Sequence, residues 1–367
     1  MTDSKDAGVR QVEWIAQDVA ERIRQQSLLI EQTGKLTDDV LAYIYEQKLF
    51  KLFVPEALGG RMMTLPDAVR LFERSSWVDG SFGWLVTIGS GGGFFVPFLT
   101  SGVAEQVYAP RSAVIAGSGH PSGVAKPVPG GYRVSGQWKY CSGSTHATVF
   151  TANCVIESDE LAESPEIRSF ILRPDQVAIV DDWKAFGLKA TESHSIVVND
   201  VFVAQDQTFS IFEQLAYHEE PIYRYPFLPF AQASFAAVAV GIGRHFVEEA
   251  KALVQRNAVA WNRANPKRAS FVMDTIATAE AHFEAAAELF LRLVDESWAL
   301  HIDGAFHEEK QQHVSQQCQR AASASLQCAQ SVYHFLGIQA TMEDTAINRI
   351  WRDLHTACQH SLLIAYE

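Results

Sequence analysis

The chain has 367 residues, of which 47% are hydrophobic, and its formal net charge is −13. This length and apolar content suffice for a large buried core divided between roughly two or three domains. Because the chain is acidic and has no Lys/Arg block, nucleic acid and an anionic membrane surface are excluded as expected partners.

Cysteine usage and the N-terminus predict a cytoplasmic protein. The five cysteines are scattered without metal-ligand spacing, which suits a reducing compartment. His301, His307 and His313 are six residues apart and do not share a helix face, so we expect no metal. The first residues have no apolar signal core, and no stretch of about 18 apolar residues predicts a membrane span.

The first part of the chain, residues 1–109, is predicted to be all-helical. Apolar residues recur at helical spacing over residues 9–33. Asp38-Asp39 is a candidate cap for a second helix, and Leu65-Pro66 begins a third helix with proline in its first turn. Asp79-Gly80 is expected to end that helix, and an apolar, glycine-containing segment follows it.

Between residues 110 and 220 the pattern changes to short alternating runs separated by Gly, Pro and acidic turns. Gly130-Gly131 marks a turn, and Tyr132–Tyr140 alternates with the period of a half-buried strand. We predict two strands of a hairpin within Gly130–Ala147 and a compact all-β domain around them.

After residue 220 the sequence predicts helices again. Four long segments have apolar stripes and end at glycine, at Asn-Pro or at the chain end: Pro229–Asn257, Phe271–Ile302, His307–Leu336 and Asp344–Tyr366. Their short connections predict an antiparallel four-helix bundle over residues 221–367.

Several segments carry a resemblance to a known family. In chain order they are Ile115-Ala116-Gly117, Pro121-Ser122-Gly123, GGYRVSGQWKYCSGSTHA at Gly130–Ala147, and Trp183 followed by FGLKATESHSIVVNDVFV at Phe186–Val203. Together they resemble the acyl-CoA dehydrogenase superfamily, and above all its flavin-dependent monooxygenase branch, the oxygenase components of two-component hydroxylases. The TEP-x-AGSD and W-I-T-N-G runs typical of true dehydrogenases are not found. The resemblance covers nearly the whole chain and implies an α+β fold: an N-terminal helical domain, a middle β-barrel domain and a C-terminal four-helix bundle.

The resemblance also implies which residues contact a flavin. Matching the hairpin motif places Tyr140, Cys141 and Ser142 at the isoalloxazine ring, with Ser142 beside N5. A hydroxyl there could slow the premature loss of hydrogen peroxide, and free backbone amides at the strand end could bond the ring edge. The alternative for Ser142 is a strand-end turn serine that bonds its own backbone.

Weaker cofactor-binding candidates come from the segment Phe186–Val203, which we call the second block, and from the last predicted helix. Matching the block adds Lys189, Thr191 and Ser193, although Lys189 replaces the family's usual arginine and lacks its bidentate fork. Arg352 belongs to an Arg-Asp pair that forms either structural ion pairs or a contact with a neighbouring subunit's flavin.

The carboxylate that an acyl-CoA dehydrogenase needs as its base is not found. The resemblance places it at Ser361 or at about Ala231, and neither residue is acidic. His360 stands one residue before the first position, where the monooxygenase branch carries a histidine. A pKa near neutrality would suit a base for a phenolic proton or a hydrogen-bond partner. The alternative is a helix histidine that caps carbonyls near the chain end.

Glycines are unexpected in an apolar helix, because each costs about 1 kcal/mol relative to alanine. Gly89, Gly91 and Gly92 therefore predict either space for a substrate beside the ring or close helix packing. The sequence favours neither explanation.

The favoured function is an oxygenase component that binds reduced flavin from a separate reductase and uses O2 to hydroxylate a small aromatic or heteroaromatic substrate. FMN is favoured over FAD, because the family's R-x-QFG segment is not recognisable around Arg263–Phe271. Two alternatives stay open: an acyl-CoA dehydrogenase-type oxidoreductase with a non-standard base, and a catalytically silent flavin-binding protein. The resemblance implies a homotetramer, and the apolar content of the last two helices exceeds what one bundle needs.

Overall fold

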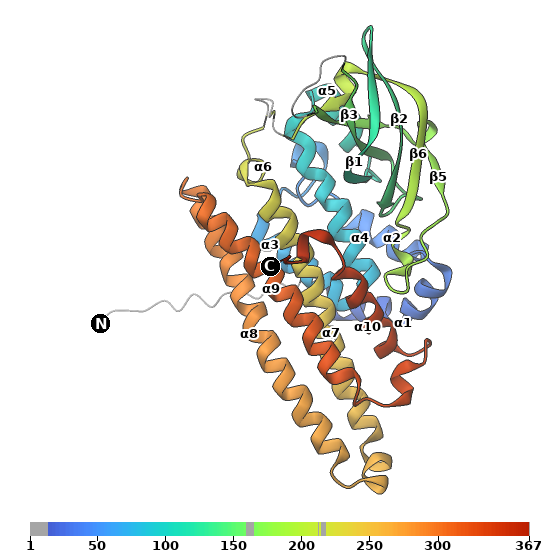
Figure 1. Cartoon of the computed structure of the whole chain (residues 1–367), viewed down its shortest axis with the longest axis vertical. Helices are drawn as coiled ribbons and strands as arrows, with labels where there is room; N and C mark the ends of the chain where they lie inside the picture. The colour runs from blue at the N-terminus through green and yellow to red at the C-terminus, as the bar shows by residue number, and fades with distance from the viewer. Residues whose placement is uncertain (1–13, 159–164, 212, 214–217, 367) are drawn as a thin grey trace, which may run out of the picture.

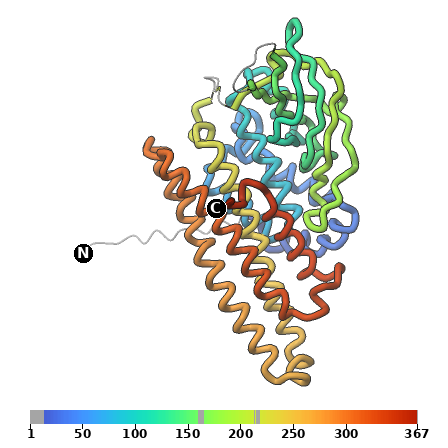
Figure 2. Tube along the Cα trace, viewed as in Figure 1, coloured from blue at the N-terminus to red at the C-terminus, as the bar shows by residue number. Residues whose placement is uncertain are grey.

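The structure of the protein is a computed structural model that describes residues 14–158, 165–211, 213 and 218–366. Figure 1 shows a β-sheet at one end of the molecule and the long C-terminal helices extending away from it. The Cα trace in Figure 2 shows the chain passing from the N-terminal helices through the sheet and back into the helical end.

The N-terminal part is helical, as predicted. Its helices are α1 (Gln17–Thr33), α2 (Asp38–Glu46), α3 (Leu65–Val78), α4 (Gly80–Gly91) and α5 (Ser101–Tyr108), with 3₁₀ turns η1 (Glu56–Leu58) and η2 (Gly92–Phe98). Residues 9–13 of the first predicted helix lie outside the described residues. Thr64 caps α3 by accepting the Asp67 N–H, and Asp79 both ends α3 and caps α4 by accepting the Phe82 N–H. Asp79 is thus the single residue that separates α3 from α4.

The middle part is a single seven-stranded sheet with the strand order β5-β6-β2-β1-β3-β4-β7. The strands are β1 (Ile115–Val128), β2 (Gly131–Cys141), β3 (Val149–Ile156), β4 (Ile167–Leu172), β5 (Ala178–Val180), β6 (His194–Ala204) and β7 (Thr208–Phe209). All pairs are antiparallel except β1 with β3. The core of the sheet is built around the buried indole of Trp138.

Two predictions about this sheet are wrong. The barrel is not closed, because the edge strands β5 and β7 have only three and two residues and do not pair with each other. The hairpin also lies elsewhere than predicted: Gly131–Cys141 is one strand, and its antiparallel partner is β1, which precedes it. Gly130 makes the turn with a φ of +83°, a conformation that favours glycine.

The C-terminal part is helical, as predicted, but its last helix is shorter. It contains α6 (Pro221–Arg224), α7 (Phe227–Ala264), α8 (Arg268–Ile302), α9 (Glu308–Tyr333), η6 (Ile338–Thr341), α10 (Ala346–Ala357) and η7 (Ser361–Leu363). The last helix was expected to reach Tyr366, and it ends at Ala357. The His360 side chain accepts the Leu362 N–H, which offers the backbone an alternative to the helical ladder.

Helix α7 is the core helix of this part. It has the length and hydropathy of a membrane-spanning helix, yet 78% of its most apolar window is buried inside the protein, as in the core helix of a soluble fold. Gly241 continues the helix rather than breaking it, and a Cβ there would overlap the Glu73 carbonyl on α3. The glycine therefore lets α3 and α7 pack backbone to backbone.

Candidate active site

The hydroxyl of Ser142 lies in the first turn after β2. Ser142 is buried, and its Oγ accepts a hydrogen bond of 2.9 Å from the indole Nε1 of Trp84 on α4. The chain turns away at Gly143, whose φ is +75°. Helix α4 packs on both β1 and α7, as its position between sheet and bundle in Figure 1 shows, so Trp84 lies where the two meet.

His360 also lies close to the Trp84 indole. Its imidazole stacks on Phe235 of α7 with ring centroids 3.9 Å apart, and it lies 6.0 Å from the Trp84 ring. The rings of Trp84 and Phe235 stack with their centroids 5.5 Å apart. We call Trp84, Phe235 and His360 the aromatic face. The structure thus brings together Ser142 and His360, which are far apart in the sequence.

Sequence reasoning missed Trp84 and Phe235. Only the structure marks Trp84: the half-exposed residues of α4 and the following turn are Trp84, Ile88, Gly91 and Phe95, which share one helical face. In an otherwise buried apolar helix, such a partly open stripe marks a side that faces something other than the core.

Two residues of the second block form hydrogen bonds that lead away from the Ser142 hydroxyl. The Oγ of Ser193 lies 2.8 Å from that of Ser142, and the Thr191 Oγ1 lies 2.7 Å from that of Ser193. Lys189 points away and pairs with Glu31 of α1 at 3.3 Å. Thr191 and Ser193 are therefore brought to the site, whereas Lys189 is not.

The backbone amides expected to be free at the strand end are engaged. The amides of Ser142, Gly143 and Ser144 donate to the carbonyls of Tyr140, Thr191 and Glu192, respectively. Two of these bonds join the turn to the backbone of residues 191–192. They also satisfy buried amides, which would be costly to leave without a partner. At Ser142 the polar group left for a ligand is the hydroxyl.

The two residues before Ser142 face in different directions. Tyr140 has a φ of +66° and is 69% exposed, and its ring meets Trp183 edge-on at 6.3 Å. Cys141 points into the core of the sheet, where burial raises the pKa of its thiol to about 12. An inert, buried thiol leaves Cys141 with only its backbone to offer to a ligand.

The hydrogen bonding of His360 fixes its tautomer at neutral pH. Its Nδ1 accepts the Leu362 N–H at 3.3 Å, so in the neutral ring the proton resides on Nε2. Burial lowers the pKa of His360 to about 4, instead of the near-neutral value expected from sequence. His360 is therefore a neutral ring that presents an N–H donor, rather than a base poised near pH 7.

Arg352 and Asp353 hold the second block in place. Arg352 is buried, pairs with Glu31 and donates to the Phe186 carbonyl. Asp353 accepts the Leu188 N–H at 2.6 Å. Together they tie α10 to the segment that carries Thr191 and Ser193. One nitrogen of Arg352, Nη2, is buried without a hydrogen-bond partner among the described residues.

The three glycines of the predicted substrate space differ. A Cβ on Gly89 would overlap the Phe50 ring, and one on Gly92 would lie 2.9 Å from Ile115. A Cβ on Gly91 would meet no atom within 4 Å. Gly89 and Gly92 thus match the close-packing explanation, and Gly91 borders open space on the same stripe as Trp84.

We expect opposite effects of alanine at Gly89 and at Gly91 on stability. Gly89→Ala should lower the free energy of unfolding by about 1–3 kcal/mol, because the buried Phe50 ring must move. Gly91→Ala, the matched control, should raise it by about 0.5–1 kcal/mol, because the glycine is helical and its Cβ has room. Urea unfolding of both variants measures this. Equal destabilisation would contradict the open space beside Gly91.

The two positions where a dehydrogenase would carry its base lie beside the aromatic face. Ala231 precedes Phe235 by one turn of α7, and Ser361 directly follows His360. Neither side chain can remove a proton from a substrate carbon at this face. No group of three or more His, Cys, Asp or Glu among the described residues has the geometry to hold a metal ion.

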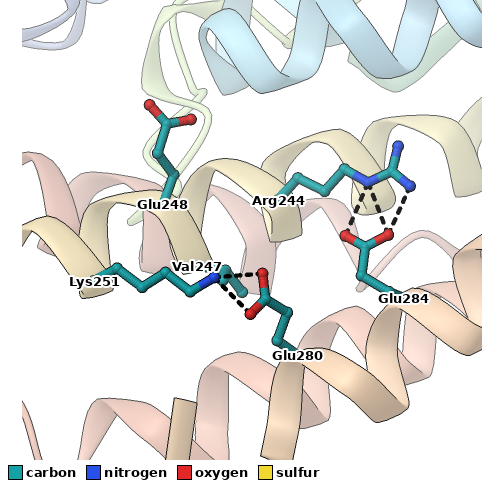
Figure 3. Close-up of a pocket in the computed structure, with 6 residues that line it drawn as sticks. All are labelled: Arg244, Val247, Glu248, Lys251, Glu280 and Glu284. Carbon is teal, nitrogen blue, oxygen red and sulfur yellow. Dashed lines mark hydrogen bonds and ion pairs between the residues drawn. The ribbon is translucent and has the colours of Figure 1, made fainter. Parts of the chain in front are cut away.

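A polar depression of about 240 Å³ lies between α7 and α8, further along α7 than Phe235. Figure 3 shows the residues that line it. Its charged side chains pair with one another: Arg244 with Glu284, and Lys251 with Glu280. Glu248, which also lines it, pairs with Arg24 of α1. These mutual pairs describe an ion-pair network between α7 and α8 rather than a second ligand site.

Known proteins resemble this chain over most of its length. A protein-family model described as "Acyl-CoA dehydrogenase, C-terminal domain" matches residues 233–364. The indole-3-acetate monooxygenase of Pseudomonas putida is 26% identical over 330 residues, which cover 89% of this chain and 84% of that one. The oxygenase component of the FADH2-dependent resorcinol hydroxylase of Rhizobium sp. (strain MTP-10005) is 24% identical over 93% of this chain and 88% of its own. The crystal structure of the HsaA monooxygenase from M. tuberculosis matches with a TM-score of 0.85 and 25% identity, covering 94% and 93% of the two chains.

Proposed function

This chain belongs to the acyl-CoA dehydrogenase superfamily, in its branch of flavin-dependent monooxygenase oxygenase components, and we propose that it hydroxylates a small aromatic substrate bound against the aromatic face. The observation that carries the proposal is the convergence of Ser142 and His360 on Trp84. The relatives named above act, by name, on indole-3-acetate and resorcinol, both of which contain an aromatic ring. Stacking of such a ring on Trp84 and Phe235 would orient it beside His360.

The protein is the oxygenase half of a two-component system, so a separate reductase supplies its reduced flavin. When bound, reduced flavin would supply the two electrons with which one atom of O2 enters the substrate and the other leaves as water. The protein's own residues have three tasks: Ser142 holds the ring edge, the aromatic face orders the substrate, and His360 donates its Nε2–H to an oxygen atom. None of these tasks needs a carboxylate base, which fits the residues found at Ala231 and Ser361.

The residues at Ser142 fit a flavin. The ring is flat and carries its reactive nitrogen on a polar edge, and here a buried hydroxyl adjoins the flat indole of Trp84. We propose FMN rather than FAD, since the 263–271 segment has no R-x-QFG run and Arg268 stacks over Trp261 at 4.0 Å. The resorcinol hydroxylase uses FADH2 by name, so both flavins belong in the binding titration.

The test is a single-turnover experiment with labelled dioxygen. The protein is loaded anaerobically with chemically reduced FMN or FAD, mixed with a panel of indoles and phenols, and exposed to labelled O2. We expect one panel member to gain one labelled oxygen atom, as measured by mass spectrometry. The control is the same mixture without protein.

Other outcomes would favour the alternatives. Bleaching of the bound oxidised flavin by an acyl-CoA under anaerobic conditions would identify a dehydrogenase with an unrecognised base. Flavin binding without oxygen transfer to any panel member and without bleaching would favour a silent flavin-binding protein. The residues at Ala231 and Ser361 argue against the first of these outcomes.

We also propose a homotetramer, and the observation that supports it is an exposed apolar surface rather than the apolar content of the last two helices. Of the apolar residues of the last two helices that motivated it, Ala321, Ala322, Val332, Leu336 and Leu363 are buried within the chain's own core, and the others are partly buried. Large apolar side chains instead lie exposed at the far end of the bundle: Val259, Phe271, Ile338 and Met342.

Light scattering is expected to give about four times the chain mass of 40.7 kDa. The variant Ile338→Asp should shift the mass downward, because a charge at this exposed apolar end opposes its burial against a second copy. A mass of 40.7 kDa for the wild type at micromolar concentration would exclude the tetramer.

A further inference from the structure

A continuous chain of hydrogen bonds runs from the aromatic face into the protein through Ser142. The Trp84 indole bonds the Ser142 Oγ at 2.9 Å, and the Ser142 Oγ bonds that of Ser193 at 2.8 Å. The Ser193 Oγ bonds the Thr191 Oγ1 at 2.7 Å, and the Thr191 Oγ1 bonds the Leu188 carbonyl at 2.9 Å. All three hydroxyl residues are buried. We call this chain the hydroxyl relay.

The two ends of the hydroxyl relay fix its direction. An indole N–H can only donate, and a carbonyl oxygen can only accept, whereas each hydroxyl has one proton and two lone pairs. The proton of Thr191 therefore points at Leu188, that of Ser193 points at Thr191, and that of Ser142 points at Ser193. One orientation satisfies all four bonds.

The reverse orientation sacrifices one bond. If Thr191 donated to Ser193, and Ser193 to Ser142, the Thr191 oxygen would face the Leu188 carbonyl oxygen with no proton between them. That contact is fixed, because the same carbonyl is held by the Trp183 indole at 3.0 Å. A missing hydrogen bond at the fully buried Thr191 hydroxyl is costly. The relay therefore adopts the first orientation, with every proton pointing towards Leu188, which we call the forward orientation.

In the forward orientation Ser142 has no proton to offer. Its proton is committed to Ser193, one lone pair accepts from Trp84, and one lone pair is left. A ligand that docks on this oxygen must bring its own hydrogen-bond donor. Reduced flavin carries a hydrogen on N5, whereas oxidised flavin presents a bare lone pair there.

We propose that the hydroxyl relay makes Ser142 an acceptor and so selects reduced over oxidised flavin, with Thr191 as the residue that sets the direction. The inference rests on the proposed function, which places the N5 edge of the ring at Ser142. Thr191 itself lies two hydroxyls from the ligand and acts through Ser193 and Ser142, as a positioning residue. Product flavin would leave more readily, because oxidation removes the N5 hydrogen that Ser142 accepts.

The matched pair Thr191→Val and Thr191→Ser tests the relay. Valine removes the terminal hydroxyl at similar volume, so Ser193 can turn its proton to Ser142, and Ser142 regains a proton for a ligand. Serine keeps the hydroxyl. The measurement is the dissociation constant of oxidised and of anaerobically reduced flavin for each protein, by fluorescence titration.

We expect the wild type to bind reduced flavin more tightly. Thr191→Val should lower the ratio of the oxidised to the reduced dissociation constant by about tenfold, the worth of one such bond. Thr191→Ser should keep the wild-type ratio. The reduction potential of the bound flavin should fall by about 30 mV in the valine variant, which is the same tenfold change for a two-electron couple.

Each failure has a separate signature. If the wild type binds neither flavin, the proposed function fails and the relay has no ligand to select. If flavin binds and the valine variant keeps both the wild-type ratio and the wild-type potential, the relay is overturned. Ser193→Ala breaks the relay one hydroxyl earlier and should give the same change as valine at 191, so it tests the inference even if the valine variant fails to fold.

Discussion

Replacing His360 with alanine is expected to lower the rate of hydroxylation by about 10²–10³-fold, the usual cost of removing one positioned hydrogen-bond donor. The reason is that the ring lies against Phe235 and Trp84 and presents Nε2–H, since its Nδ1 accepts the Leu362 N–H. Flavin binding should change little, because the hydroxyl proposed to hold the flavin ring edge belongs to Ser142, which bonds Trp84 and Ser193 rather than His360. Single-turnover hydroxylation with the identified substrate measures the rate.

Two further variants separate a donor role from a base role. His360→Asn can still cap η7 but has no group where Nε2 was, whereas His360→Gln places an amide N–H near Nε2 and cannot titrate. If His360 donates, the glutamine variant should stay within about tenfold of the wild type while the asparagine variant falls like alanine. If His360 is the base, both variants should fall by about 10²–10⁴-fold.

The pH profile provides an independent check of the same role. Because burial lowers the pKa of His360 to about 4, the wild-type rate should show no titration of this residue between pH 5 and pH 8. The rate should fall only as pH drops towards 4, when protonation of Nδ1 breaks the bond to Leu362. The glutamine variant should lack that limb. A wild-type limb near pH 6.5 that disappears in the glutamine variant would restore the base.

Replacing Asp353 with asparagine is expected to stabilise the protein at pH 8 and to have much less effect at pH 5. Burial, reinforced by the neighbouring Asp79, raises the pKa of Asp353 to about 7, although the bond from Leu188 and the charge of Arg349 oppose this. A carboxyl whose folded pKa lies above its unfolded value contributes stability that is fully present below the unfolded value. That stability is lost as pH rises through 7.

The expected size follows from the shift. A shift of about three pKa units corresponds to roughly 4 kcal/mol in all, of which roughly 2–3 kcal/mol falls between pH 5 and pH 8. Asparagine can still accept the Leu188 N–H and cannot ionise. The free energy of unfolding of Asp353→Asn relative to wild type should therefore rise by roughly 2–3 kcal/mol over that interval, as measured by urea titration at both pH values.

Asp295 provides the matched control for this prediction. It is partly exposed and forms a bidentate pair with Arg70, with N–O distances of 2.8 and 2.7 Å. Asp295→Asn should cost about 0–1 kcal/mol at pH 8, as is usual for surface pairs, and so has the opposite sign. An Asp353→Asn variant that loses stability at pH 8 would show that its carboxylate is ionised and well compensated in the fold.

The helical and β parts, and most helix starts, could be predicted because their signals are local. Pro66 favours a helix start in its own turn, and Asp79 caps the helix that begins at the next residue. Gly130 permits a turn because glycine adopts its positive φ readily. The motif around Ser142 also identifies the family from a short segment. The end of the last helix could not be predicted, since His360 caps η7 through a side-chain bond that competes with the helix.

The sequence by itself determined the order of elements and the family, and it identified Ser142 and His360 as candidate site residues. Periodicity, capping and motif spacing are properties of neighbouring residues, so they can be read without the fold. Only the tertiary structure decided what those side chains can do. Trp84 joins them because α4 packs between β1 and α7, and packing between distant segments leaves no local pattern. The direction of each hydrogen bond depends on its partners at both ends, so the Leu188 carbonyl and the Leu362 amide decide that Ser142 accepts and His360 donates.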